Sequence, residues 1–113
     1  MTPKEMALVL AEALDSKKGQ DIKVLETGAL TTLADYFVIC TATSTTQVKA
    51  LADECEKVMK ERGEAPHHIE GHRGDFSSVV VHLFMDEARQ FYDLERLWKD
   101  AVDVDLSDIL KPN

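Results

Sequence analysis

Several residue types are scarce in this 113-residue chain, and each scarcity excludes a class of protein. No apolar run approaches the length that a membrane span needs. Lysine and arginine number 13 against 21 acidic residues, and the resulting net charge of -8 argues against autonomous binding to a nucleic acid. An acidic chain can still bind a basic protein, including one that itself sits on a nucleic acid.

Cysteine is also scarce, with only Cys40 and Cys55 present. Both fall on faces that the sequence pattern predicts to be buried. We therefore expect reduced, inert core thiols of a cytosolic protein, because free cysteine behaves as a small hydrophobe. A disulfide or a nucleophilic cysteine is the alternative.

The strongest pattern is the apolar run from Tyr36 to Cys40, followed by a switch to helical periodicity. Such a run is typical of a strand buried on both faces, in a sheet covered by helices. Ser44 can cap the helix that follows, and Gln47 can reach back to the Ser44 amide in a capping box. One face of this helix carries apolar residues only, namely Val48, Leu51, Ala52, Cys55 and Met59.

The turn between this strand and this helix, residues 41–46, resembles the loop in which many α/β proteins hold a ligand. Only five glycines occur in the chain and none lies in this turn, so its backbone cannot fold closely around a phosphate. The sequence favours a hydroxyl-rich helix cap here, with a phosphate site as the alternative.

The first third of the chain predicts a helix followed by a strand. Thr2, Pro3 and Glu5 form a helix start, which leads us to expect no signal or transit peptide. The apolar stripe of this helix is Met6, Val9, Leu10, Ala13 and Leu14. The helix ends at Lys17-Lys18-Gly19, with cations at its negative end and glycine past the last turn. Residues 21–27 form a plausible strand.

The second half begins with an extended segment at residues 65–71, since Pro66 constrains its predecessor and itself. Residues 78–84 predict another buried strand, and short helices are expected at 87–92 and 94–98. The order of elements predicts one α/β domain over residues 1–99, with a small mixed sheet covered by helices. The acidic tail, residues 100–113, is expected to be frayed, with docking on a surface as the alternative.

Residues that carry catalytic chemistry do not form a recognisable set. His67, His68 and His72 suit zinc, but two of them are adjacent and no cysteine is near in sequence, so surface histidines are favoured. His82 in a buried strand is interpreted as a core or rim histidine, with a Cys-His pair as the alternative. Asp35 and Asp75 flank the two buried strands, each alone. We therefore expect no catalytic residues, no metal and no cofactor.

The segment from Phe91 to Trp98 is dense in aromatic residues for a chain with only 6% of them. A terminal helix that closes the core explains most of this pattern. Tyr92, Glu95 and Arg96 are then expected to face outward, and aromatic and arginine residues on a rim are typical of protein interfaces.

Taken together, these segments resemble the ribosomal silencing factor family, also called the iojap-like family. The resemblance covers nearly the whole chain in order, and several blocks that agree together make it specific. The blocks are Ala34–Ile39, Thr43-Ser44, Gln47–Asp53, Glu70-Gly71, Val79–Phe84 and Glu87–Trp98.

The resemblance implies a nucleotidyltransferase-like α/β fold without the catalytic acids of the transferases, and an activity of binding without chemistry. It implies a cytoplasmic protein that binds ribosomal protein fourteen of the large subunit on its intersubunit face. Members thereby block joining of the small subunit and lower translation when nutrients are short. The alternatives are a metal-dependent enzyme of nucleotidyltransferase type that uses Asp35 or Asp75, and a self-associating scaffold; a homodimer is compatible with the ribosomal role.

One departure from the family pattern lies between Gly71 and Asp75, where a strand with a tryptophan is absent and about half a dozen residues are missing. Either an edge strand is lost or the molecule holds residues that this sequence omits, and the second is favoured because a lost strand would expose sheet and core. By position, the residues that border the family's partner-binding surface are Glu70, His72, Asp75 and Phe76, with Tyr92 as a neighbour.

Overall fold

The computed structural model describes residues 1–30, 32, 34–64, 66, 68–70, 73–85 and 99–110, with the backbone alone described at positions 68 and 70. The expected short helices at 87–92 and 94–98 lie outside these residues. Within the described part the helices are α1 (Pro3–Ser16) and α2 (Thr45–Glu61), and the strands are β1 (Gln20–Glu26), β2 (Tyr36–Ala42), β3 (His68–Glu70), β4 (Arg73–Phe76), β5 (Val79–Met85) and β6 (Val102–Asp103).

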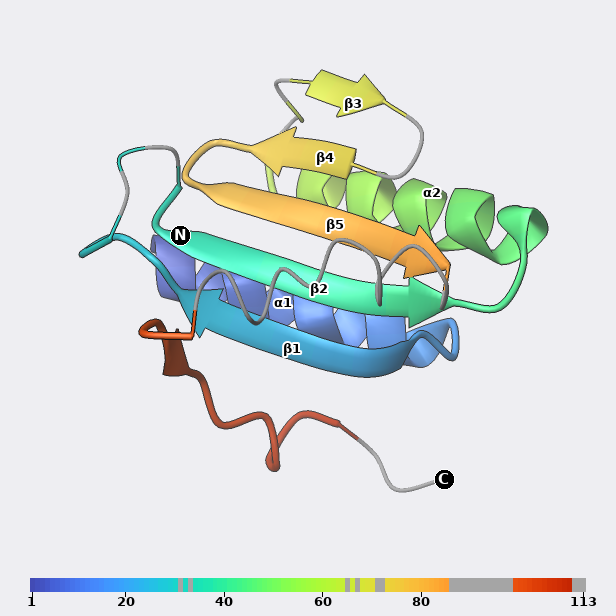
Figure 1. Ribbon diagram of the computed structural model, residues 1–113. Helices are drawn as coiled ribbons and strands as arrows, with labels where there is room; N and C mark the ends of the chain where they lie inside the picture. The colour runs from blue at the N-terminus through green and yellow to red at the C-terminus, as the bar shows by residue number, and fades with distance from the viewer. Residues whose placement is uncertain are drawn as a thin grey trace.

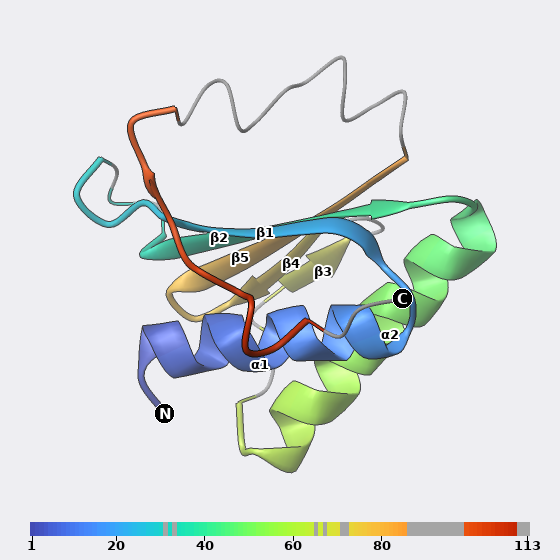
Figure 2. The same cartoon turned by 90° about the horizontal axis from the view of Figure 1, so that it is seen from below.

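The strands form one mixed sheet in the order β3-β4-β5-β2-β1-β6, which confirms the predicted fold class. The central strands β2 and β5 are parallel, and every other neighbouring pair is antiparallel. Both described helices lie against one face of the sheet (Figures 1 and 2). None of the described helices has the length and apolar character required to cross a lipid bilayer.

The centre of the sheet follows the sequence pattern closely. In β2 all residues from Phe37 to Ala42 are buried, as expected for a strand covered on both faces. The larger core cluster lies between the sheet and the helices, and it includes Leu10 and Leu14 of α1, and Leu51 and Met59 of α2. A second cluster on the opposite face of the sheet includes Phe37, Ile39, Val80 and Phe84.

Both helix starts are capped, though not in the same way. The Glu5 amide donates to Thr2 Oγ1 at 3.1 Å and the Thr2 amide donates to Glu5 Oε1 at 3.0 Å, which confirms the first capping box. At α2 the Gln47 amide donates to Ser44 Oγ as expected. The Gln47 side chain, however, accepts from the Thr43 amide and not from Ser44, so the second half of that prediction is wrong by one residue.

The end of α1 differs from the prediction in its use of glycine. The residue with positive φ is Lys18, at 63°, and not Gly19. Gly19 is required for another reason, because a Cβ there would overlap Cys40 Sγ and lie 3.0 Å from the Leu14 carbonyl oxygen. The glycine lets the chain pass close to β2 as it leaves α1.

The expectation of a frayed tail is wrong for residues up to 110. β6 pairs with the edge of β1, and the Val104 amide donates to the Val24 carbonyl at 2.9 Å. The tail then turns to the helical side of the sheet (Figure 2). There Leu106 is buried, and Ile109 and Leu110 pack against the larger core cluster. The alternation of apolar and acidic residues from Val104 onward allows this, since the apolar side chains pack against the core and the aspartates stay exposed.

Candidate functional site: the β3–β4 edge of the sheet

Three of the five residues predicted to border a partner surface belong to one edge of the sheet. Glu70 ends β3, Asp75 lies in β4 and Phe76 ends β4. The other two, His72 and Tyr92, lie outside the described residues. The structure therefore brings three of the five predicted residues together on a single hairpin at the end of the strand order.

The segment that the sequence predicted to lack a strand still supplies two. β3 pairs with β4, and β4 pairs with β5 from Arg73↔His82 to Phe76↔Val79. A tight turn at Ser77 and Ser78 joins β4 to β5, and Ser77 has a φ of 56°. The loss of an edge strand, the less favoured alternative in the sequence analysis, would leave β5 uncovered, whereas in the structure β4 lies beside β5 and covers the core.

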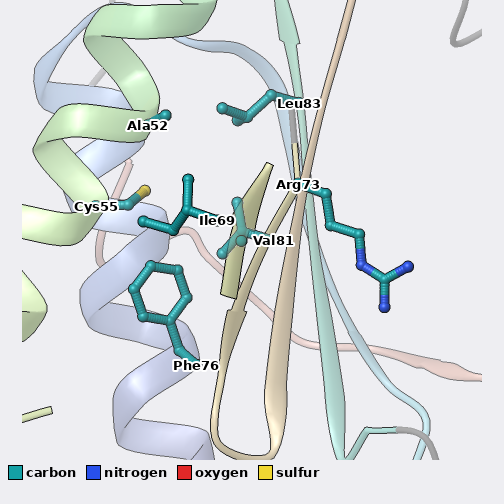
Figure 3. A pocket seen from close by; sticks show the side chains of 8 residues that line it. Ala52, Cys55, Ile69, Arg73, Phe76, Val81 and Leu83 are labelled. Atoms are coloured by element: carbon teal, nitrogen blue, oxygen red, sulfur yellow. The ribbon is translucent and has the colours of Figure 1, made fainter. Parts of the chain in front are cut away.

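Asp75 lies on the sheet face opposite the helices, where it pairs with Arg73. The Arg73 Nε donates to Asp75 Oδ1 at 3.1 Å, and the two side chains are 52% and 29% exposed. Figure 3 shows the Arg73 side chain extending away from α2. An exposed ion pair contributes little to stability. Because both side chains are partly exposed, the two charged groups can be reached from solvent.

Phe76 lies on the other face of β4, and only 2% of it is exposed. It packs into the larger core cluster beside α2 (Figure 3). A Cβ at Gly74 would approach the Phe76 ring to 2.8 Å, so the glycine makes room for the ring. Phe76 thus supports the edge from within, and in this structure a partner can reach Asp75 but not the Phe76 ring.

A shallow apolar depression, called here the α2–β3 niche, lies between α2 and this edge. Its described lining is Ala52, Cys55, Ile69, Arg73, Gly74, Phe76, Val81 and Leu83. The interior holds about 10 Å³, room for one water or methyl group, and the whole depression with its open mouth measures about 240 Å³. Ile69, at 36% exposure, lies at the mouth. No pattern in the sequence indicated this niche, because its walls come from three separate segments.

Cys55 faces the niche from α2 (Figure 3). Burial is the largest cause that raises the pKa of its thiol to about 12, and the neighbouring Cys40 and Glu54 add to the effect. Both cysteines are buried and no disulfide joins them, which agrees with the prediction of core thiols. A thiol with such a high pKa is a poor nucleophile near neutral pH.

The fold separates His82 from Cys40 and Asp35 from Asp75, whereas His67, His72 and the side chain of His68 lie outside the described part of the chain. His82 stands opposite Ile39 across the parallel pair, whereas Cys40 stands opposite Leu83, so His82 and Cys40 lie on different faces of the sheet. His82 packs instead between Phe37 and Phe84, with ring centroids 5.4 and 5.7 Å away. Asp75 and Asp35 belong to segments separated by β5, a spacing of roughly 10 Å between strand axes.

The turn before α2 is a helix cap, as the sequence favoured. Besides its bond from the Thr43 amide, Gln47 uses its Nε2 to donate to the carbonyls of Lys17 and Lys18, at 3.3 and 3.0 Å. Gln47 thus ties the start of α2 to the end of α1. Within the described residues, no group of three or more histidine, cysteine or acidic side chains is arranged to hold a metal ion.

Comparison with known proteins gives one consistent result. The sequence model of the family described as "RsfS: Ribosomal silencing factor during starvation" matches residues 1–113. The chain is 34% identical over 116 residues to the ribosomal silencing factor RsfS of Halalkalibacterium halodurans, which covers 97% of this chain and 99% of the relative. It is 37% identical over 112 residues to that of Bacillus subtilis, which covers 94% and 95%.

A crystal structure of a Chromobacterium violaceum protein matches with a TM-score of 0.84 and 37% identity, over 88% of each chain. The alignment with the Halalkalibacterium halodurans relative extends over 116 positions although this chain has 113 residues, so that relative carries residues that have no counterpart here.

Proposed function

Because this chain belongs to the family of ribosomal silencing factors, we propose that it regulates translation by binding the ribosome, without chemistry of its own. In this proposal the chain binds protein fourteen of the large subunit on the intersubunit face. It thereby blocks joining of the small subunit and lowers translation under nutrient limitation. The observation that carries the proposal is the family match over residues 1–113, whose description names silencing during starvation.

The charge of the chain supports a basic ribosomal partner. A net charge of -8 opposes binding to the phosphate backbone of ribosomal RNA but favours encounter with a basic protein. In this proposal the protein is cytoplasmic, and its negative charge restricts docking to places where a basic protein surface is exposed. A homodimer that hides the same surface until the ribosome competes for it is compatible with this role.

The proposed contact surface is the β3–β4 edge, with Glu70, His72, Asp75 and Tyr92 as contact residues and Phe76 as the internal support of β4. Asp75 and Arg73 give this surface a defined polar pair that a partner can engage. Phe76 acts by holding the strand in place, since 2% exposure leaves it no contact area.

The proposal is tested by co-sedimentation of the purified protein with large ribosomal subunits. The informative variant is Asp75→Lys, and the matched control is Glu12→Lys, an exposed position on α1 that makes the same change in net charge. We expect Asp75→Lys to weaken binding and Glu12→Lys to leave it nearly unchanged. If the unaltered protein fails to sediment with large subunits at low salt, the proposed function is wrong.

A further inference from the structure

The two edges of the sheet differ in how they are covered. β1 is covered by β6 and by the bond from the Val104 amide to the Val24 carbonyl. β3 is the last strand at the other end, and among the described residues no strand pairs with its outer side. An unpaired strand presents a row of amide and carbonyl groups that can accept another strand.

The α2–β3 niche lies directly beside this open edge. Ile69 stands opposite Gly74 in the hairpin, on the face toward α2, and its side chain lies at the mouth of the niche (Figure 3). An extended segment that paired with β3 would place alternate side chains on this same face. One of them would then lie over Ile69 and between β3 and α2.

We propose that β3 accepts an extended segment of the ribosomal partner as an added strand, with one branched aliphatic side chain of that segment seated over Ile69 at the mouth of the niche. This inference rests on the proposed function and adds to it the mode of contact. Strand addition draws affinity from backbone hydrogen bonds, and pockets for alternate side chains supply specificity.

The dimensions and the rim of the niche define what it accepts. Room for one methyl group fits a branched aliphatic side chain that covers the mouth and sends a single methyl inward, and it excludes an aromatic ring. The lining that α2 contributes, Ala52 and Cys55, carries no charge. Apolar contact and backbone pairing therefore provide the local recognition.

The choice of a basic ribosomal partner as the occupant rests on charge and on position. The chain carries a net charge of -8, which draws basic proteins to it. The hairpin that holds Ile69 also holds Glu70 and Asp75, two of the proposed contact residues. An added strand thus extends the proposed contact surface without a second site.

The experiment measures binding of purified ribosomal protein fourteen to four full-length chains. These are the unaltered protein, Ala52→Leu, Ala50→Leu and Ile69→Thr. Ala52→Leu fills the niche from α2, and Ala50→Leu adds the same side chain at an exposed position of that helix. Ile69→Thr keeps the branched β carbon that favours a strand, and it removes most of the apolar surface that Ile69 presents at the mouth of the niche.

We expect Ala52→Leu to bind about tenfold more weakly and Ile69→Thr several-fold more weakly, with Ala50→Leu equal to the unaltered protein. Hydrogen exchange on the unaltered complex gives a second readout that depends on no substitution. Among residues 68–70, the amides that point away from β4 should become protected, because an added strand takes up their hydrogen-bonding groups.

The outcomes separate the two proposals. Unchanged binding of all variants, together with unprotected amides at 68–70, would overturn strand addition and leave the proposed function intact. Absence of binding by the unaltered protein to both protein fourteen and the large subunit would overturn both. If the variants alter self-association in analytical ultracentrifugation but not binding to protein fourteen, the edge serves a second copy of the chain and the inference is wrong.

Discussion

Replacement of Gly19 by alanine tests how the end of α1 is fitted to the sheet. The new Cβ would overlap Cys40 Sγ, and it would lie 3.0 Å from the Leu14 carbonyl oxygen and 3.3 Å from Leu51 Cδ2. All three neighbours belong to the buried core, where an added methyl group costs about 1–3 kcal/mol. At about 4 °C for each kcal/mol in a domain of this size, we expect the melting temperature to fall by about 4–12 °C.

A double-mutant cycle isolates the cause. Cys40→Ala removes the sulfur that the new Cβ overlaps and alone costs about 1 kcal/mol for the lost packing. In the double variant the clash with sulfur is gone, so the two effects should fall short of their sum by about 1–2 kcal/mol. Gly63→Ala is the contrast, because nothing lies within 4 Å of its Cβ position and its φ of +76° alone makes alanine unfavourable.

The assay is urea and thermal unfolding of the four chains of the cycle, followed by circular dichroism. Gly63→Ala should cost about 1 kcal/mol, and Cys40→Ala should not rescue it. Strict additivity of Gly19→Ala and Cys40→Ala would refute the steric explanation of Gly19.

Three further predictions concern the tail, the first helix and the core thiol. Leu106→Ala should lower the unfolding free energy by about 2–3 kcal/mol, whereas Val102→Ala, at a position 62% exposed, should change it by less than about 0.5 kcal/mol in urea unfolding. Hydrogen bonds with the amide and the hydroxyl of Thr2 lower the pKa of the Glu5 carboxyl group below its ordinary value of 4.5. The stability that these bonds contribute is therefore present above pH 4.5 and is lost as the pH falls through the lowered pKa. A pH series of thermal melts should accordingly show a steeper loss below pH 4.5 for the unaltered protein than for Glu5→Gln; parallel curves would contradict this. With the thiol pKa of Cys55 at about 12, roughly one molecule in ten thousand is a thiolate at pH 8, so Ellman's reagent should label Cys55 only after unfolding; rapid labelling of the native chain would contradict the burial.

Patterns local in sequence predicted the centre of the fold correctly. The unbroken apolar run of β2 predicted a strand buried on both faces, and the switch of period after it predicted α2. The capping box at Thr2 and Glu5 is likewise set by residues three positions apart. In these places the interactions that decide the structure join residues that are near one another along the chain.

Features that depend on distant segments could not be predicted in the same way. The acidic tail is held in place because Leu106 packs into a core formed by other elements. The composition of the tail alone does not reveal this contact. Gly19 is needed because it lies beside Cys40, which is twenty-one residues along the chain, and the left-handed position falls on Lys18. The α2–β3 niche exists only where α2, β3 and the β4–β5 hairpin meet.

The candidate site lies between these two cases. The family resemblance indicated the region around Glu70 and Asp75, and the structure gathers the described members on one hairpin. Residue order alone did not say which way each side chain faces. Alternation along β4 decides it, since Arg73 and Asp75 lie on one face while Gly74 and Phe76 lie on the other.

The most direct test of the proposed role is sedimentation of purified small and large ribosomal subunits in the presence of this protein. With the protein in excess, the proposal predicts separate subunits in place of joined ribosomes, and recovery of joining with Asp75→Lys but not with Glu12→Lys. Normal joining of the subunits at saturating concentrations of the unaltered protein would contradict it.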